Sequence, residues 1–173
     1  MGSATPKQML IARWTDLIND PSLHDLPYKI ELNAEGKIEK SPASNRHGTL
    51  QARVAWALRD ALSSGEVITE CSVLTDIGVR VPDLVWASSR FLESQQDATP
   101  FTQAPEICVE VVSPSNTARE IDDKVRAYLA AGAREVWVAN EDGKLKIAGP
   151  EGLREKSEYG ILIELPAPRS APR

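Results

Sequence analysis

Residues 106–139 read EICVEVVSPSNTAREIDDKVRAYLAAGAREVWVA, a pattern of strand, helix and strand that decides the fold. The flanking runs 106–112 and 135–139 are apolar and rich in β-branched side chains, which favour buried strands. The segment 118–131 between them repeats apolar side chains at helical spacing, and Gly132 ends it. A unit of this order predicts two parallel neighbouring strands joined by a right-handed crossover.

The helix of this unit has a defined start. Thr117 is a candidate N-cap, and Glu120, three residues later, completes the pattern of a capping box. The turn-forming residues 113–116 separate this cap from the preceding strand. Both ends of the crossover helix are therefore predicted from local signals.

Shorter signals predict the other elements. One amphipathic helix covers 7–18, and a second covers about 47–63 and stops at Gly65. Strand-like runs lie at 28–32, 37–39, 66–69, 77–81, 83–87 and 144–148. Because strands and helices are mixed along the chain, the predicted class is α/β or α+β, with a mixed central β-sheet flanked by helices.

The length and composition fit one globular domain. The chain has 173 residues, of which 42% are hydrophobic and 26% charged, close to the average of folded domains. We expect a single domain over residues 1–165. The last residues, 166–173, hold three prolines in eight positions and are predicted to be disordered. The tryptophans are predicted to be core anchors: Trp14, Trp56, Trp86 and Trp137.

Charge and cysteine content narrow the functional classes. The formal net charge is −5, which argues against a strong nonspecific nucleic-acid binder but leaves a nuclease with metal-binding carboxylates open. No stretch reaches the roughly 18 consecutive apolar residues of a membrane span, so no membrane partner is expected. The absence of a secretory signal and the presence of only two cysteines, Cys71 and Cys108, predict a cytoplasmic protein.

Three charged residues stand where a charge is costly to bury. Glu110 lies inside the apolar strand 106–112, and Asp83 lies in another β-forming stretch. Lys124 falls beside the buried arc of the predicted helix 118–131. Each of these residues therefore needs a partner or a function.

Each of the three also has an interpretation without chemistry. Glu110 could pair with a neighbouring arginine, and Asp83 could act as a turn residue or a local cap. Lys124 could form an exposed ion pair with Glu120, four residues before it on the same helix. Only a common location would favour the functional interpretation over these three separate ones.

Taken together, the three residues fit metal-dependent phosphodiester chemistry. The carboxylates of Asp83 and Glu110 on adjacent strands can hold Mg²⁺ or Mn²⁺, with the backbone carbonyl of Val111 as a further ligand. Such a metal acidifies a bound water and neutralises charge on a phosphodiester. The ammonium of Lys124 can orient that water or stabilise the developing negative charge.

Several short blocks, in their order and spacing, resemble a large bacterial family. They are Tyr28-Lys29-Ile30-Glu31, Gly36-Lys37-Ile38, Ser41-Pro42, Arg46-His47, Val81-Pro82-Asp83, Glu110-Val111-Val112-Ser113-Pro114-Ser115, Lys124, Tyr128, Ala131-Gly132 and Glu135-Val136-Trp137-Val138. The family is the Uma-two family of predicted endonucleases, which has the restriction-endonuclease fold. The resemblance covers about residues 7–148.

The resemblance implies a PD-(D/E)XK nuclease core that acts on DNA. Asp83 then matches the first acidic position and Glu110 the second. The lysine of this pattern normally lies two residues after the second acid, where this chain has Val112. The family places the lysine on the following helix instead, and Lys124 matches that place.

The resemblance also implies two accessory residues. Glu31 could complete the surroundings of the metal, or it could be a solvated glutamate on a half-exposed strand. His47 could contact phosphate, or it could help to begin its helix. Many nucleases of this fold work as dimers with one site per strand of a duplex, so a homodimer is also expected.

Two functions of different classes follow. The first is a metal-dependent endonuclease that hydrolyses DNA phosphodiester bonds. The alternative is a catalytically inactive nuclease-fold module that binds nucleic acid or a protein partner, which the acidic balance and the missing in-strand lysine motivate. Cation binding separates the two, because an inactive module would bind none. The sequence does not decide between DNA and RNA as the substrate.

Overall fold

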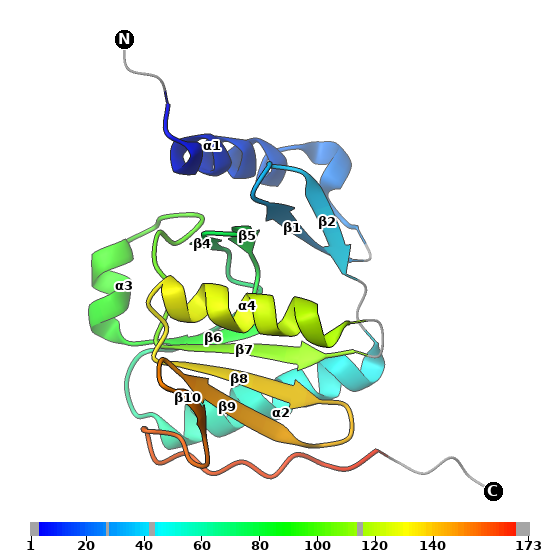
Figure 1. Ribbon diagram of the computed structural model, residues 1–173, viewed down its shortest axis with the longest axis vertical. Coiled ribbons are helices and arrows are strands. Elements are labelled where there is room, and N and C mark those ends of the chain that lie inside the picture. Colours follow the sequence, from blue (N-terminus) through cyan, green and yellow to red (C-terminus); the bar gives the residue numbers. More distant parts are fainter. Residues whose placement is uncertain (1–3, 27, 42–43, 114–115, 169–173) are drawn as a thin grey trace, which may run out of the picture.

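Two β-sheets and four α-helices make up the described part of the chain, residues 4–26, 28–41, 44–113 and 116–168 of a computed structural model (Figure 1). The elements in chain order are α1 (Pro6–Ile18), a short 3-10 helix (Pro21–Leu23), β1 (Lys29–Asn33), β2 (Ile38–Ser41), α2 (Asn45–Ala61), β3 (Glu66–Thr69), β4 (Val73–Thr75), β5 (Gly78–Arg80), β6 (Leu84–Ala87), α3 (Ser89–Gln95), β7 (Ile107–Val112), α4 (Ala118–Ala130), β8 (Glu135–Asn140), β9 (Leu145–Gly149) and β10 (Gly152–Arg154).

The larger sheet has six strands in the order β10-β9-β8-β7-β6-β3. Only β7 and β8 run parallel within it, with Ile107 opposite Glu135, and the other neighbours are antiparallel. The helix α4 joins these two strands, and its start carries the predicted capping box between Thr117 and Glu120. The prediction of a mixed central sheet flanked by helices is therefore confirmed.

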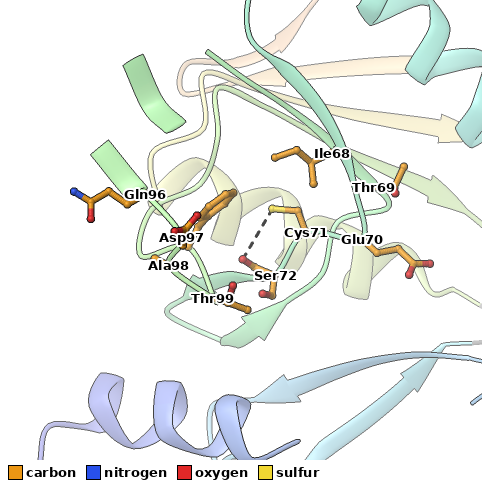
Figure 2. A pocket seen from close by; sticks show the side chains of 10 residues that line it. Ile68, Thr69, Glu70, Cys71, Ser72, Gln96, Asp97, Ala98 and Thr99 are labelled. Carbon is orange, nitrogen blue, oxygen red and sulfur yellow. Dashed lines mark hydrogen bonds between the residues drawn. The ribbon is translucent and has the colours of Figure 1, made fainter. Parts of the chain in front are cut away.

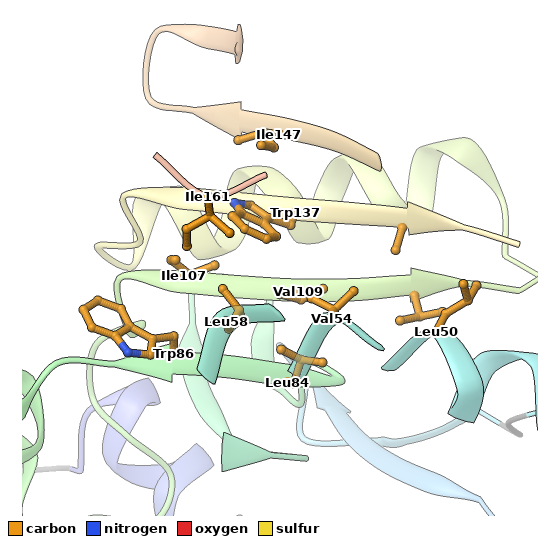
Figure 3. Packing of buried hydrophobic residues seen from close by; sticks show 12 residues of the cluster. Leu50, Val54, Leu58, Leu84, Trp86, Ile107, Val109, Trp137, Ile147 and Ile161 are labelled. Carbon is orange, nitrogen blue, oxygen red and sulfur yellow. The ribbon is translucent and has the colours of Figure 1, made fainter. Parts of the chain in front are cut away.

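The helix α2 covers one face of the six-stranded sheet (Figure 3). Its buried side chains Leu50, Val54 and Leu58 pack against apolar residues of the sheet, among them Val109 and Trp137. Strand β7 contributes every second residue to this face, as the alternation of a strand requires. This apolar layer fixes β7 in the centre of the fold.

The helix α4 covers the opposite face of the same sheet. Tyr128 of α4 is fully buried there against Val85, Cys108 and Val136. Because Cys108 points to this side, Glu110 two residues later points to it as well. The alternation of β7 thus aims a carboxylate into the space beneath α4.

The smaller sheet has the order β2-β1-β5-β4 and is entirely antiparallel. The predicted single strand 77–81 is in fact the second arm of a hairpin formed by β4 and β5. Gly78 opposes Asn33 of β1 with a φ of +119°, and a side chain there would collide with the backbone of Leu32 and Asn33.

The helix α1 packs on the smaller sheet through Leu10, Trp14 and Leu17 (Figure 1). Together they form a lobe that lies over the α4 side of the larger sheet. The side chain of Lys29 on β1 reaches from this lobe to Asp83, which directly precedes β6.

The C-terminal segment after β10 contains no helix or strand up to residue 168. The carbonyl of Pro166 accepts a hydrogen bond from Arg46, which ties this segment to the start of α2. The rest of the predicted disordered tail, 169–173, lies outside the described residues. Among the described residues, no helix is long and apolar enough to cross a membrane. The core assignment of Trp56 is wrong, because this side chain on α2 is 72% exposed.

Candidate active site

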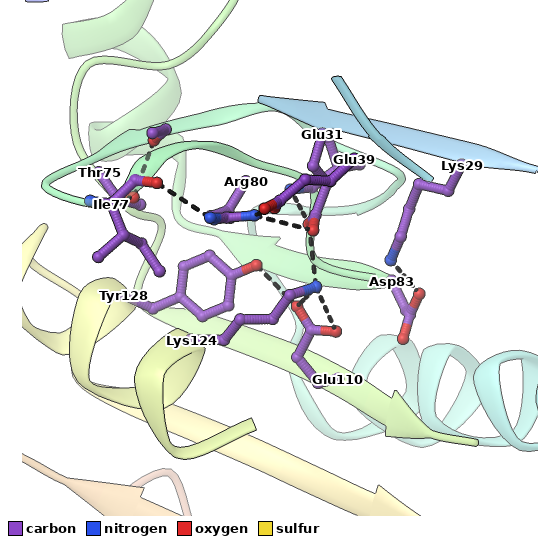
Figure 4. A network of polar contacts seen from close by, with 12 residues as sticks. Lys29, Glu31, Glu39, Thr75, Ile77, Arg80, Asp83, Glu110, Lys124 and Tyr128 are labelled. Atoms are coloured by element: carbon purple, nitrogen blue, oxygen red, sulfur yellow. Dashed lines mark hydrogen bonds and ion pairs between the residues drawn. The ribbon is translucent and has the colours of Figure 1, made fainter. Parts of the chain in front are cut away.

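A buried cluster of charged residues joins the two sheets and α4 (Figure 4). It contains Asp83, which precedes β6, Glu110 of β7 and Lys124 of α4, the three residues predicted to act together. The accessory candidate Glu31 and its neighbour Lys29 enter it from β1. Residues far apart along the chain thus meet in one network, which the separate interpretations of each residue did not require.

Glu110 lies on the α4 side of β7 and is 3% exposed. Its Oε1 accepts a hydrogen bond from the Tyr128 hydroxyl at 2.7 Å. The Lys124 ammonium lies 3.3 Å from Oε1 and 3.4 Å from Oε2. Both partners come from α4 and are four residues apart, so one face of the helix holds this carboxylate.

Asp83 is held by three donors from three elements. Lys29 Nζ donates to its Oδ1 at 2.6 Å, and His47 Nε2 lies 3.2 Å from the same oxygen. The backbone N–H of Val111 donates to Oδ2 at 2.7 Å. This last bond places the Asp83 carboxylate directly beside β7, next to Glu110.

Glu31 is bound tightly within the cluster rather than solvated. Its Oε1 accepts hydrogen bonds from Lys124 Nζ at 2.9 Å and from the Val81 N–H at 2.8 Å. Arg80 Nη1 lies 3.4 Å from its other oxygen and also pairs with Glu39. Glu31 is 5% exposed, so it is a buried carboxylate that binds the side chains of Lys124 and Arg80.

The lysines keep two of the three acids charged. Burial raises the pKa of Glu31, but the charges of Lys124 and Lys29 outweigh it, and the pKa falls below its usual value. Burial also tends to raise the pKa of Asp83, but the hydrogen bond from His47 and the charge of Lys29 outweigh it and lower the pKa to about 2.

Glu110 behaves in the opposite way. The effect of its burial outweighs the attraction of Lys124 and Lys29, and the neighbouring charges of Asp83 and Glu31 add to it, so the pKa of Glu110 is raised. Burial alone would lower the pKa of Lys124, but Glu110 and Glu31 raise it above its usual value. Lys124 is therefore a firmly protonated ammonium.

The donor set fits a hard divalent cation. Four carboxylates face three cationic side chains in the network, which leaves one formal negative charge in excess: Glu31, Glu39, Asp83 and Glu110 against Lys29, Arg80 and Lys124. Among the residues the structure describes, no three His, Cys, Asp or Glu side chains form a ready metal cage. Mg²⁺ does not need one, because it is commonly held by one or two carboxylates with water in its other positions.

A hollow of about 520 Å³ borders the cluster between α4 and the β1–β2 hairpin, and neither Asp83 nor Glu110 is among its lining residues. Its lining includes Glu31, Arg80 and Lys124 of the cluster, together with Glu120 and Asp123 of α4. A ligand in this hollow would contact Lys124 directly.

Sequence reasoning missed three members of the cluster. No role for Lys29, Arg80 or Tyr128 is predicted from the sequence. A signal for Lys29 existed, because strand alternation places it on the same face as Glu31, opposite Ile30.

A different hollow, of about 410 Å³, lies between β3, β4 and the end of α3 (Figure 2). It contains no residue of the cluster, and its two acids, Glu70 and Asp97, are exposed. Burial raises the pKa of the Cys71 thiol in its wall to about 12, so this cysteine is not a nucleophile at neutral pH. The charged cluster is therefore the better candidate site.

The mixed sheet with helices on both faces, and the buried carboxylates at its centre, are consistent with a core of the restriction-endonuclease type. The family described as "Uma2: Putative restriction endonuclease" matches residues 20–166. Because this match covers well over half of the chain, the protein belongs to the Uma2 family.

Comparison with solved structures agrees on the fold. A crystal structure from Anabaena variabilis ATCC 29413, of a protein described as "a putative nuclease belonging to DUF820", superposes with a TM-score of 0.68. The two chains are 16% identical, and the match covers 95% of this chain and 90% of the other. Among curated proteins, no sequence matches this chain.

Proposed function

We propose that this protein is a metal-dependent endonuclease that hydrolyses phosphodiester bonds of DNA. One observation carries the proposal: Asp83, Glu110 and Lys124 lie in a single buried network. Membership of a nuclease-like family supports the same reaction class. The proposal goes further in naming the metal, the substrate and the role of each residue.

The two acids would hold Mg²⁺ or Mn²⁺. Asp83 and Glu110 would contribute carboxylate oxygens, and Val111 its backbone carbonyl, with water in the remaining positions. When bound, the cation would acidify a water molecule and offset charge on the phosphodiester. Support comes from the excess of one negative charge, since a divalent cation would reverse the sign of the cluster and match a singly charged phosphodiester.

Lys124 would act as a fixed positive charge rather than as a base. Its raised pKa keeps the side chain protonated, so it can donate hydrogen bonds but cannot accept a proton. Held by Glu31 and Glu110, the ammonium faces the hollow through which a substrate would enter. There it would orient the attacking water and stabilise negative charge that develops on the phosphoryl oxygens.

His47 would support Asp83 more than it would contact phosphate. It occupies the first turn of α2, where its backbone N–H donates to the cap residue Ser44 at 3.0 Å. Its Nε2 lies 3.2 Å from Asp83 Oδ1. The ring thus fixes the orientation of the carboxylate, in the way that outer partners orient a metal ligand.

The proposal also covers the oligomeric state of the protein, its compartment and its partner. We expect a homodimer, because cleavage of both strands of a duplex needs one site for each strand. Light scattering on the purified protein measures this state directly. We also expect the protein to act in the cytoplasm. Its expected partner is nucleic acid, and no association with a membrane is expected.

The experiment is a cleavage assay with single-stranded and double-stranded DNA, and with RNA, in Mg²⁺ or Mn²⁺. The variants Asp83→Asn, Glu110→Gln and Lys124→Met should each lose about 100-fold or more of the activity. Asp60→Asn on the exposed side of α2 is the matched control for loss of one carboxylate. Full activity in Asp83→Asn or Glu110→Gln would refute these assignments, and cleavage of RNA alone would correct the substrate.

A second candidate function is a binding module without catalysis. It is favoured by Val112 at the position of the in-strand lysine and by the absence, among the described residues, of a ready cage of three or more ligands. Calorimetric titration with Mn²⁺ decides between the two. If the titration shows no heat of Mn²⁺ binding while the protein still binds DNA or a protein partner, the binding module is favoured.

A further inference from the structure

Every oxygen of the Asp83 carboxylate already has a donor. Oδ1 accepts from Lys29 at 2.6 Å and lies 3.2 Å from His47 Nε2, and Oδ2 accepts from the Val111 N–H at 2.7 Å. Asp83 is 3% exposed, so water cannot easily replace these partners. A cation that binds to Oδ1 must therefore displace a donor.

The three donors differ in how freely they can leave. Val111 N–H belongs to the central strand β7, and His47 lies in the first turn of α2. Lys29 Nζ is the end of a flexible four-carbon side chain that reaches down from the smaller sheet. Lys29 is thus the donor that can move without disturbing the fold of the larger sheet.

Lys29 also carries the charge that a cation would replace. The carboxylates that attract its ammonium most are Glu110 and Asp83, which are the two proposed metal ligands. Its side chain is only 12% exposed, so the ammonium is held between β1 and β6 and is not a surface charge. The contact at 2.6 Å is the shortest of those that the Asp83 carboxylate makes.

We propose that Lys29 is a built-in counter-ion that occupies the cation position at Asp83 in the metal-free protein and leaves it when a divalent cation binds. The inference rests on the proposed function, because it needs the metal at Asp83 and Glu110. Ammonium and metal compete for the same oxygen, so Lys29 weakens metal binding while it keeps the acids paired in the absence of metal. After exchange, the ammonium stays tethered to β1 beside the site, where an anionic substrate can take the place of Asp83.

The first test is calorimetric titration with Mn²⁺ of the full chain and of Lys29→Met. Loss of the competing ammonium should tighten Mn²⁺ binding by about tenfold or more, because a charge a few ångströms away acts strongly in a buried site. Lys37→Met is the matched control, since Lys37 is an exposed lysine of the same hairpin and its loss changes the net charge equally. The control should bind Mn²⁺ as the wild type does.

Equal or weaker Mn²⁺ binding by folded Lys29→Met would overturn the exchange, while the proposed function would stand. If neither the wild type nor Lys29→Met binds Mn²⁺, the metal-dependent function itself fails and the exchange fails with it. Circular dichroism establishes whether the variant is folded.

The second test needs no variant and therefore does not depend on the folding of Lys29→Met. Brief acylation of the wild-type protein, followed by mass spectrometry, reports how reactive each lysine is. Lys29 should be protected without metal and should react several-fold faster with Mn²⁺, whereas Lys37 should react equally in both states. No change at Lys29 under saturating Mn²⁺ would overturn the exchange.

Discussion

Glu31 Oε1 accepts a hydrogen bond from Lys124 Nζ at 2.9 Å and so joins β1 to α4 across 93 residues of chain. The contacts of the same ammonium with Glu110 are longer, at 3.3 and 3.4 Å. Glu31 is itself fixed by the Val81 N–H. This geometry favours Glu31 as a positioning residue that holds Lys124 over Glu110, rather than as a metal ligand.

Glu31→Gln tests this role. The amide keeps the shape of the side chain but loses the charge that holds Lys124, so DNA cleavage should fall by about 10–100-fold, as is usual when an outer partner is lost. Mn²⁺ affinity, measured by calorimetry, should stay near that of the wild type. Glu39→Gln on the neighbouring strand, which removes the other carboxylate paired with Arg80, is the control. A large loss of Mn²⁺ affinity in Glu31→Gln would instead make Glu31 a metal ligand.

The local elements of the fold could be predicted from the sequence, because their signals are local. The capping box at Thr117 and the apolar runs around α4 are visible in consecutive residues. The hairpin of β4 and β5 was not predicted, since its strands are three residues long. Its place in the sheet depends on pairing with β1, as between Leu32 and Val79, and such distant pairing leaves no local pattern.

The residues of the charged cluster could be predicted only in part, for a similar reason. Glu110 and Asp83 were found because charges in apolar strands need partners, and Lys124 because of its place on the helix. Lys29 was not predicted, because a lysine on a short hairpin is normally exposed to solvent. Its burial results from the packing of one sheet over the other. The number of donors around Asp83 is thus a tertiary property that the spacing of residues cannot reveal.

Tyr128→Phe should weaken the cluster without changing the core. The variant keeps the buried ring but removes the hydroxyl that donates to Glu110 at 2.7 Å. Loss of one hydrogen-bond donor to a buried carboxylate lowers stability by about 1–3 kcal/mol, so the free energy of unfolding should fall by that amount. Urea unfolding in EDTA measures it. An unchanged free energy would mean that water replaces the hydroxyl.

Glu135 supports a second buried network, which ties the segment after β10 to the sheet. Its carboxylate has no exposed surface and accepts hydrogen bonds from Trp137, Ser157 and the Glu158 N–H at 2.6–2.8 Å, while Arg154 lies 3.1 Å away. Glu135→Ala leaves these donors unpaired and should cost about 3 kcal/mol of unfolding free energy.

The control for this prediction is Glu158→Gln, which removes only the partly exposed ion pairs with Arg134 and Arg154. Exposed pairs contribute about 0–1 kcal/mol, so this variant should lose far less stability. Equal losses in the two variants, measured by urea unfolding, would contradict the assignment of Glu135 as the centre of the network.

Alkaline pH should destabilise the protein through Tyr159. Its ring packs edge-on against Trp86 at 5.4 Å, and burial, followed by the charge of Glu158, raises its pKa from 10.0 to about 12. Because the folded state favours the neutral phenol, this stabilisation is complete below pH 10 and is lost as the pH rises through about 12. Tyr159→Phe keeps the ring without the ionisable group, so its unfolding free energy should fall less steeply over this window and match the wild type at pH 8. Urea unfolding at pH 8, 10 and 11.5, followed by tryptophan fluorescence, measures the difference, and parallel curves for the two proteins would contradict the prediction.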